Sequence, residues 1–188
     1  MTDHEFLAIV AGIRGINHYE DRPDIWGKGL LNGSVSALRV LSHLTKAEEP
    51  MVAGKTGEYV TRAFAVRRFG DIFEPIDFCR RTRGDGGIDL KLAGVTLQIK
   101  TRVDAPDLLV KKIDEWGRSL PLCGMAHVFC DWKRDYHVKV LGWIRNRDME
   151  GLPTAPSRRG NWLNWVIPEN SLSPMSRLWS EMEVRLAR

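Results

Sequence analysis

The sequence predicts one α/β domain, and three features of its pattern support that prediction. Residues 55 to 69 repeat apolar side chains at helical spacing. Residues 88 to 101 alternate apolar and polar side chains around a short turn, which is typical of a β-hairpin. Short apolar runs follow, and residues 175 to 186 favour a closing helix. Helices and strands mixed along 188 residues are expected to pack around a single core.

Composition narrows the class of protein. The chain is 43% hydrophobic and 28% charged with a formal net charge of +4, which is typical of a globular domain and compatible with a polyanionic partner. No apolar run reaches the roughly 18 to 20 residues of a membrane span, and the acidic start is unlike a signal peptide. Three scattered cysteines indicate free thiols. We therefore expect a cytoplasmic protein with no membrane partner.

The first part of the chain has weak periodicity. Residues 6 to 13 fit a short helix or a strand, and residues 34 to 44 show a helical pattern. We expect residues 1 to 50 to be an N-terminal extension packed on the core, and residues 51 to 188 to form the main domain. At the end of the helix predicted for 55 to 69, Gly70 occupies the position that follows a helix C-terminus.

The hairpin is the most informative stretch. The dipeptide Ala93-Gly94 fits a two-residue turn, so Leu92 should face Val95. Counting outward places Asp89 opposite Gln98, with Lys100 two residues further on the same face. The polar face then comprises Asp89, Lys91, Thr96, Gln98 and Lys100, and the apolar face Ile88, Leu90, Leu92, Val95, Leu97 and Ile99.

The rest of the chain predicts further strands. Residues 108 to 110, 126 to 130 and 136 to 143 fit short strands, with Gly142 as punctuation. Residues 151 to 161 contain prolines and glycines and predict an exposed loop, after which residues 162 to 167 fit an edge strand.

The polar face of the hairpin has the residue types that phosphodiester hydrolysis needs. A carboxylate (Asp89), an amide oxygen (Gln98) and the backbone carbonyl of Ile99 are hard oxygen donors suited to a divalent cation. The ammonium group of Lys100 can orient the attacking water or stabilise the charge that develops on the phosphate.

These residues carry a family resemblance. Asp89 followed by Gln98-x-Lys100 across a hairpin, with the turn Gly84-Asp85-Gly86-Gly87 before it, resembles the PD-(D/E)XK nuclease superfamily, also called restriction endonuclease-like. The Gln-x-Lys form is similar to the Mrr-type branch, and the arrangement is also similar to small phage-encoded nuclease-like proteins. The tight part of the resemblance spans residues 54 to about 102.

The resemblance implies a central four-stranded mixed sheet flanked by helices. It implies Mg²⁺ or Mn²⁺ bound by Asp89 and Gln98 with the Ile99 carbonyl, Lys100 as the catalytic lysine, and Glu58 on the first core helix as an auxiliary ligand or base. The implied activity is a DNA endonuclease in the cytoplasm, that of the host if the protein is phage-encoded. Many members dimerise, which leaves a homodimer open.

Several alternatives stay open at this stage. Gln98 stands where the family has an acid, so a catalytically weak fold that binds nucleic acid or protein, in phage defence or counter-defence, is the second reading. Glu58 and Arg62 are spaced for an ion pair on a helix surface, and Asp85 fits a turn residue.

Two further groups of residues could bind ligands. Arg80, Arg81, Arg83 and Arg102 flank the hairpin motif and are expected to contact the phosphate backbone of a nucleic acid. Cys123-x3-His127-x2-Cys130 suggests a zinc site, but it lacks a fourth ligand and overlaps a predicted buried strand, which favours core residues.

Overall fold

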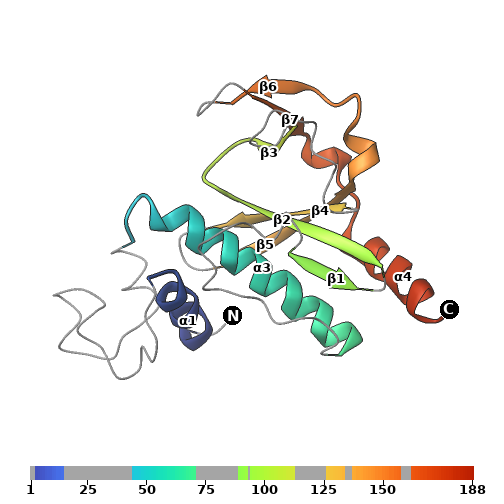
Figure 1. Cartoon of the computed structure of the whole chain (residues 1–188), viewed down its shortest axis with the longest axis horizontal. Helices are drawn as coiled ribbons and strands as arrows, with labels where there is room; N and C mark the ends of the chain where they lie inside the picture. Colours follow the sequence, from blue (N-terminus) through green and yellow to red (C-terminus); the bar gives the residue numbers. More distant parts are fainter. Residues whose placement is uncertain are drawn as a thin grey trace.

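The computed structural model describes residues 3–14, 44–70, 89–92, 94–112, 126–133, 137–157 and 162–188. Helices and strands are mixed along these ranges, as predicted (Figure 1). The α-helices are α1 (Asp3–Arg14), α3 (Glu48–Phe69) and α4 (Met175–Leu186). The strands are β1 (Leu90–Leu92), β2 (Val95–Val103), β3 (Leu108–Lys111), β4 (Ala126–Trp132), β5 (Val138–Arg145), β6 (Thr154–Pro156) and β7 (Leu163–Ile167). Two 3₁₀ turns, η3 (Asn146–Met149) and η4 (Glu169–Ser171), complete the order.

A four-stranded sheet with the order β1-β2-β4-β5 lies at the centre. The β1–β2 and β4–β5 pairs are antiparallel, whereas β2 and β4 run parallel. The mixed four-stranded sheet expected from the sequence is therefore present. Because a parallel pair cannot be joined by a tight turn, the chain between β2 and β4 must cross over, and it contributes β3 to a second sheet on the way.

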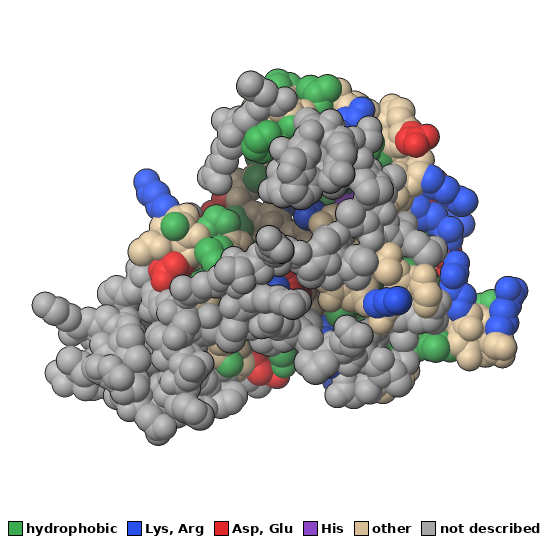
Figure 2. Space-filling model, in the orientation of Figure 1, with side chains coloured by type: hydrophobic (Ala, Val, Ile, Leu, Met, Phe, Trp, Pro, Cys, Tyr) green, Lys and Arg blue, Asp and Glu red, His purple; other side chains and the backbone are tan. Residues whose placement is uncertain are grey.

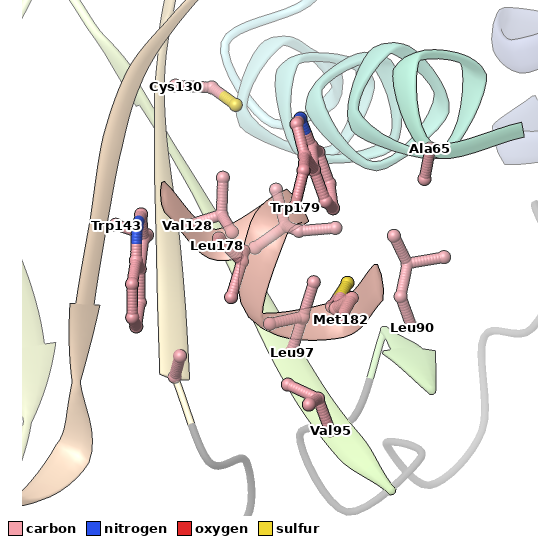
Figure 3. Packing of buried hydrophobic residues seen from close by; sticks show 12 residues of the cluster. Ala65, Leu90, Val95, Leu97, Val128, Cys130, Trp143, Leu178, Trp179 and Met182 are labelled. Carbon is pink, nitrogen blue, oxygen red and sulfur yellow. The ribbon is translucent and has the colours of Figure 1, made fainter. Parts of the chain in front are cut away.

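Helices α3 and α4 cover one face of this sheet (Figure 3). The core on this side is formed by alternate residues of the strands together with one face of each helix. Its members are Ala65, Leu90, Val95, Leu97, Ile99, Ala126, Val128, Cys130, Trp143, Leu178, Trp179 and Met182. Alternate residues at the start of β2 are buried, and the buried residues of α4 follow the 3.6-residue repeat of a helix. Both elements could therefore be predicted from their sequence patterns.

The described strands that cover the opposite face form a second sheet, which the sequence did not predict, although two of its strands were expected at residues 108 to 110 and 162 to 167. They form a three-stranded sheet with the order β3-β7-β6 (Figure 1). A second apolar cluster joins this small sheet to the central one through Leu108, Val110, Phe129, Ile144, Met149, Trp165 and Ile167. The central sheet is thus buried between helices on one side and a second sheet on the other.

Two predictions about the small sheet were wrong. Residues 162 to 167 were expected at an edge, but β7 is the central strand, paired with β3 and with β6. The predicted loop 151 to 161 contains β6, which has only three residues and ends at Pro156. A proline lacks the N–H that a central strand needs, so this short strand is confined to an edge and resembles a loop in sequence.

The long helix α3 begins earlier than residue 55. Thr45 and Glu48 cap it reciprocally: the Glu48 N–H donates to Thr45 Oγ1 at 3.2 Å, and the Thr45 N–H donates to Glu48 Oε2 at 2.8 Å. Pro50 lies in the first turn, where a missing N–H costs no hydrogen bond. The expected C-terminal glycine is confirmed, since Gly70 has a φ of 81° and its N–H donates to the Val66 carbonyl.

Helix α1 settles the open assignment for residues 6 to 13, which form a helix. Its buried residues Phe6, Ile9, Val10 and Ile13 follow helical spacing, and α1 packs against α3. The Tyr59 hydroxyl on α3 donates a hydrogen bond to Glu5 Oε1, and burial followed by the contact with Glu5 raises the pKa of Tyr59 to about 12. The pattern at residues 34 to 43 lies outside the described residues.

Gly142, expected as punctuation in the strand predicted for 136 to 143, lies inside β5. The pairing of β4 with β5 shifts between Phe129 and Cys130, so β5 contains an irregularity at this point. With a φ of 151°, Gly142 approaches Ser173 so closely that an added Cβ would lie 2.7 Å from the Ser173 carbonyl oxygen. The glycine therefore permits close backbone packing. No helix among the described residues is long and apolar enough to cross a membrane.

Candidate functional site

The β1–β2 hairpin has the predicted register. Leu92 pairs with Val95 and Leu90 with Leu97, so Asp89 stands directly before the first paired residue of β1. Gly94 has a φ of 72°, the conformation that the predicted tight turn requires. Leu90, Val95, Leu97 and Ile99 are buried on the helix side, whereas Gln98 and Lys100 are partly exposed on the other face. The polar face predicted from the sequence is therefore formed.

Asp89 extends the hairpin beyond the end of β1. Its N–H donates to the Leu97 carbonyl at 2.8 Å, and its carboxylate oxygen Oδ2 accepts the Ile99 N–H at 2.5 Å. The Asp89 side chain thus accepts a hydrogen bond that a backbone carbonyl accepts in a regular pair of antiparallel strands. Because the N–H and C=O of one strand residue point to the same side, the Ile99 carbonyl is directed toward the Asp89 side of β2. Carboxylate, amide and backbone carbonyl then lie around one end of the hairpin.

Glu58 reaches the sheet from the opposite face. Helix α3 approaches β2 closely at Gly57, where an added Cβ would lie 2.0 Å from Thr101 Oγ1. The next residue, Glu58, is mostly buried, and its Oε2 is 2.6 Å from Lys55 Nζ. The structure therefore places Glu58 beside β2 but gives its carboxylate a lysine partner three residues earlier.

The donor set decides which cations fit. Within the described ranges, no group of three or more histidine, cysteine, aspartate or glutamate side chains is arranged to hold a metal ion. The hairpin itself offers hard oxygens from Asp89, Gln98 and the Ile99 backbone, which are the ligand types of Mg²⁺ and Mn²⁺. Because only one of these groups carries a charge, the set fits a weakly held divalent cation.

Arg102 is engaged within the protein. Its guanidinium donates to Asp131 Oδ1 at 2.9 Å, to the Pro106 carbonyl at 3.1 Å and to Glu169 Oε1 at 2.5 Å. These contacts join β2, β4 and η4, so the structure gives Arg102 a stabilising role. The other predicted backbone contacts, Arg80, Arg81 and Arg83, lie outside the described residues, as do Asp85 and its glycine-rich turn.

We predict that Arg102→Ala lowers the free energy of unfolding by about 1.5 to 3 kcal/mol, because it leaves the partly buried carboxylate of Asp131 without its charged donor. Arg147→Ala is the matched control, since Arg147 is 75% exposed and pairs only loosely with Asp148 at 3.4 Å. Urea denaturation of both variants measures the difference. Equal, small losses in the two variants would contradict the stabilising role.

His127 is a residue of this face that the sequence did not predict. It lies on β4, directly beside Gln98, and its side chain is 2% exposed. Neither ring nitrogen has a hydrogen-bond partner among the described residues. The only sequence signal was the Cys/His spacing, and the strand geometry excludes the zinc site: Cys130 faces α3, with its Sγ 3.7 Å from Thr61 Oγ1, whereas alternation puts His127 on the opposite face. Cys123 lies outside the described residues.

The surroundings of His127 keep its imidazole neutral. Burial, and then the positive charge of Lys100, lower the pKa of His127 to about 4. The ring lies near that of Phe129, at 6.4 Å between centroids. Figure 2 shows the molecular surface hollowed below the small sheet.

This pKa predicts a pH dependence of stability. The folded-state pKa of about 4 lies below the ordinary value of 6.5, so the unfolded chain binds more protons between these values. Stability from this residue is complete above pH 6.5 and is lost as the pH falls toward 4, by about 3 kcal/mol. Urea denaturation in EDTA at pH 7 and pH 4.5 tests this, with His127→Leu expected to reduce the loss. The same pH dependence in both proteins would contradict it.

The chain was compared with protein-family models, with curated proteins and with solved structures, and no match was found. A function for the hairpin face therefore depends on the chemistry of its own residues.

Proposed function

We propose that this protein is a metal-dependent nuclease with a restriction endonuclease-like core, which hydrolyses phosphodiester bonds in DNA. The observation that carries the proposal is the register of the hairpin. It pairs Leu90 with Leu97, so Asp89 comes directly before β1 with its carboxylate on the Ile99 N–H, while Gln98 and Lys100 share a partly exposed face of β2. A carboxylate, an amide oxygen and an ammonium group on adjacent strands are the parts that phosphodiester hydrolysis requires.

Each residue of this face has a role in the proposed reaction. Asp89 and Gln98, with the Ile99 carbonyl, would hold Mg²⁺ or Mn²⁺, which when bound neutralises phosphate charge and makes water more acidic. Lys100 orients the attacking water or stabilises the charge on the pentacovalent phosphorus. The water oxygen forms the new P–O bond, the bond to the leaving oxygen breaks, and that oxygen takes up a proton.

The Asp89 hydrogen bond to Ile99 supports a preorganised site. The backbone N–H of Ile99 on β2 holds the Asp89 carboxylate in place, and this donor is more rigid than a side chain would be. Glu58 lies on the helix-covered side of the sheet, so it would assist as an auxiliary ligand or base only after leaving Lys55 and reaching past β2 to the other side. We propose that the enzyme acts in the cytoplasm, that of the host if a phage encodes it, and that Arg80, Arg81 and Arg83 bind the DNA backbone.

A second function is favoured by the low charge of the site. Gln98 replaces an acid, and the described residues contain no cluster of three metal-binding side chains of the acidic, histidine or cysteine type. A nuclease fold that binds nucleic acid or protein without cutting would tolerate both features.

Cleavage assays separate the two functions. The purified protein is incubated with supercoiled DNA, linear DNA, single-stranded DNA and RNA, each with Mg²⁺, Mn²⁺ or EDTA. A nuclease gives cation-dependent products that EDTA abolishes, and conversion of supercoiled DNA to nicked or linear forms shows endonuclease action. Retarded migration of a nucleic acid that stays intact with every cation would favour the binding module and oppose the nuclease.

A further inference from the structure

The strongest unexplained feature of the molecule is the buried imidazole of His127. Burying a polar group without a hydrogen-bond partner is costly, and such groups in folded proteins call for an explanation. Here both ring nitrogens lack a partner among the described residues, although the side chain is only 2% exposed. A site that is completed by a ligand would explain this cost.

The sheet register shows what lies beside this histidine. Gln98 on β2 is paired with His127 on β4, and Asp89 lies on the other side of β2, where its carboxylate accepts the Ile99 N–H. Gln98 and His127 form one row across adjacent strands, and the apolar Ile144 on β5 ends the row. Neighbouring strands are roughly 4.8 Å apart, so side chains that start one strand spacing apart on β2 and β4 can converge on one ion.

We propose that His127 is a ligand of the divalent cation at this site, together with Asp89 and Gln98, which makes the site select Mn²⁺ over Mg²⁺. This proposal rests on the cation site of the proposed nuclease and specifies it further. Mg²⁺ requires oxygen ligands, whereas imidazole nitrogen suits the first-row transition metals. The nitrogen donor compensates for the acid that Gln98 lacks, because it supplies affinity without adding charge.

The environment of the ring supports this role. The ring is buried, and no hydrogen bond among the described residues occupies either of its nitrogens. Its neighbours Phe129 and Ile144 belong to the apolar cluster under the small sheet, so the ring lies at the border between that cluster and the polar row.

The test measures binding, independently of cleavage. Calorimetric titration of the full chain with Mn²⁺ and with Mg²⁺ should show tighter binding of Mn²⁺. His127→Leu should weaken Mn²⁺ binding by at least about tenfold, since even the loss of outer-shell partners of metal ligands typically costs 10- to 100-fold. The Mg²⁺ affinity of this variant should change little, and the control His137→Leu, at an exposed histidine on the β4–β5 connection, should bind both cations as the wild type does.

Two further readouts keep the test decisive. Pulsed electron paramagnetic resonance of bound Mn²⁺ should show coupling to an imidazole nitrogen, which His127→Leu removes. Without metal, His127→Leu should unfold at a temperature no lower than the wild type, because leucine replaces an unpaired polar group by an apolar one of similar size. A variant that fails to fold would be replaced by His127→Gln, which should retain weak binding and lose the nitrogen coupling.

The outcomes are distinguishable. Equal Mn²⁺ affinity of wild type and His127→Leu, or bound Mn²⁺ without nitrogen coupling, would overturn the role of His127 and leave the nuclease proposal standing. Binding of neither cation by the wild type would overturn both. Nitrogen-coupled Mn²⁺ in a protein that cleaves no nucleic acid would confirm this inference and refute the nuclease.

Discussion

Replacing Lys100 by alanine is expected to reduce cation-dependent DNA cleavage by at least about 100-fold, the usual effect of removing one group that stabilises charge in a transition state. The lysine lies on the same face of β2 as Gln98, two residues beyond it. Its loss should leave metal binding intact, because an ammonium group is no metal ligand. Rates on supercoiled DNA and a Mn²⁺ titration of the same variant measure the two effects separately.

Asp89 should be tested with asparagine as well as alanine. The Ile99 N–H donates to the Asp89 carboxylate, so Asp89→Ala also removes a backbone acceptor and should cost about 1 kcal/mol of stability. Asp89→Asn keeps an acceptor but removes the charge, and it should abolish both cleavage and cation binding. Lys91→Ala, at an exposed position of the same hairpin, is the control that should cut normally.

These variants can refute the mechanism directly. If Asp89→Asn and Lys100→Ala both retain wild-type cleavage with Mg²⁺ or Mn²⁺, the polar face of the hairpin is not the catalytic site. Unchanged circular dichroism of each variant shows that any loss of activity is not a loss of fold.

Gly57→Ala is expected to destabilise the protein by about 1 to 3 kcal/mol, the range for overpacking a well-packed core. The new methyl group would lie 2.0 Å from Thr101 Oγ1 and 3.3 Å from Thr101 Cβ, so α3 and β2 must separate or Thr101 must turn. Gly54→Ala in the same helix is the matched control. No neighbouring atom lies within 4 Å of its added Cβ, and the higher helix propensity of alanine should stabilise by up to about 1 kcal/mol.

The contact responsible can be isolated by a double variant. Thr101→Ala removes the oxygen that clashes and should restore most of the stability lost in Gly57→Ala, as measured in a double-mutant cycle by urea denaturation. If Gly57→Ala and Gly54→Ala stabilise equally, the close approach of α3 to β2 is not tight. Because Glu58 follows Gly57, a displaced helix should also move this carboxylate relative to the sheet.

Much of the fold could be predicted because its signals are local. The hairpin register depends on a two-residue turn and on alternation over a few residues on each side, so the pairing of Leu92 with Val95 could be predicted. Helix α4 was confirmed over its full length from its periodicity. The start of α3 was missed because its signal is a capping pair, Thr45 with Glu48, that stands before the apolar repeat.

The small sheet could not be predicted from local sequence patterns alone. Strand β6 is short and ends at a proline, so nothing within its own sequence distinguishes it from a loop; only its pairing with β7 makes it a strand. In the same way, the sequence predicted Arg102 as a nucleic-acid contact, because its partners Asp131 and Glu169 are distant in sequence and meet its guanidinium only in the folded protein.

The sequence by itself determined the hairpin, its register and the three residue types that support a nuclease. Only the tertiary structure decided that His127 stands beside Gln98 and that Lys55 neutralises Glu58 next to the sheet. The physical reason is the nature of the contacts. An antiparallel hairpin is fixed by neighbours in sequence, whereas the parallel pairing of β2 with β4 depends on a crossover whose two ends meet only in the folded protein.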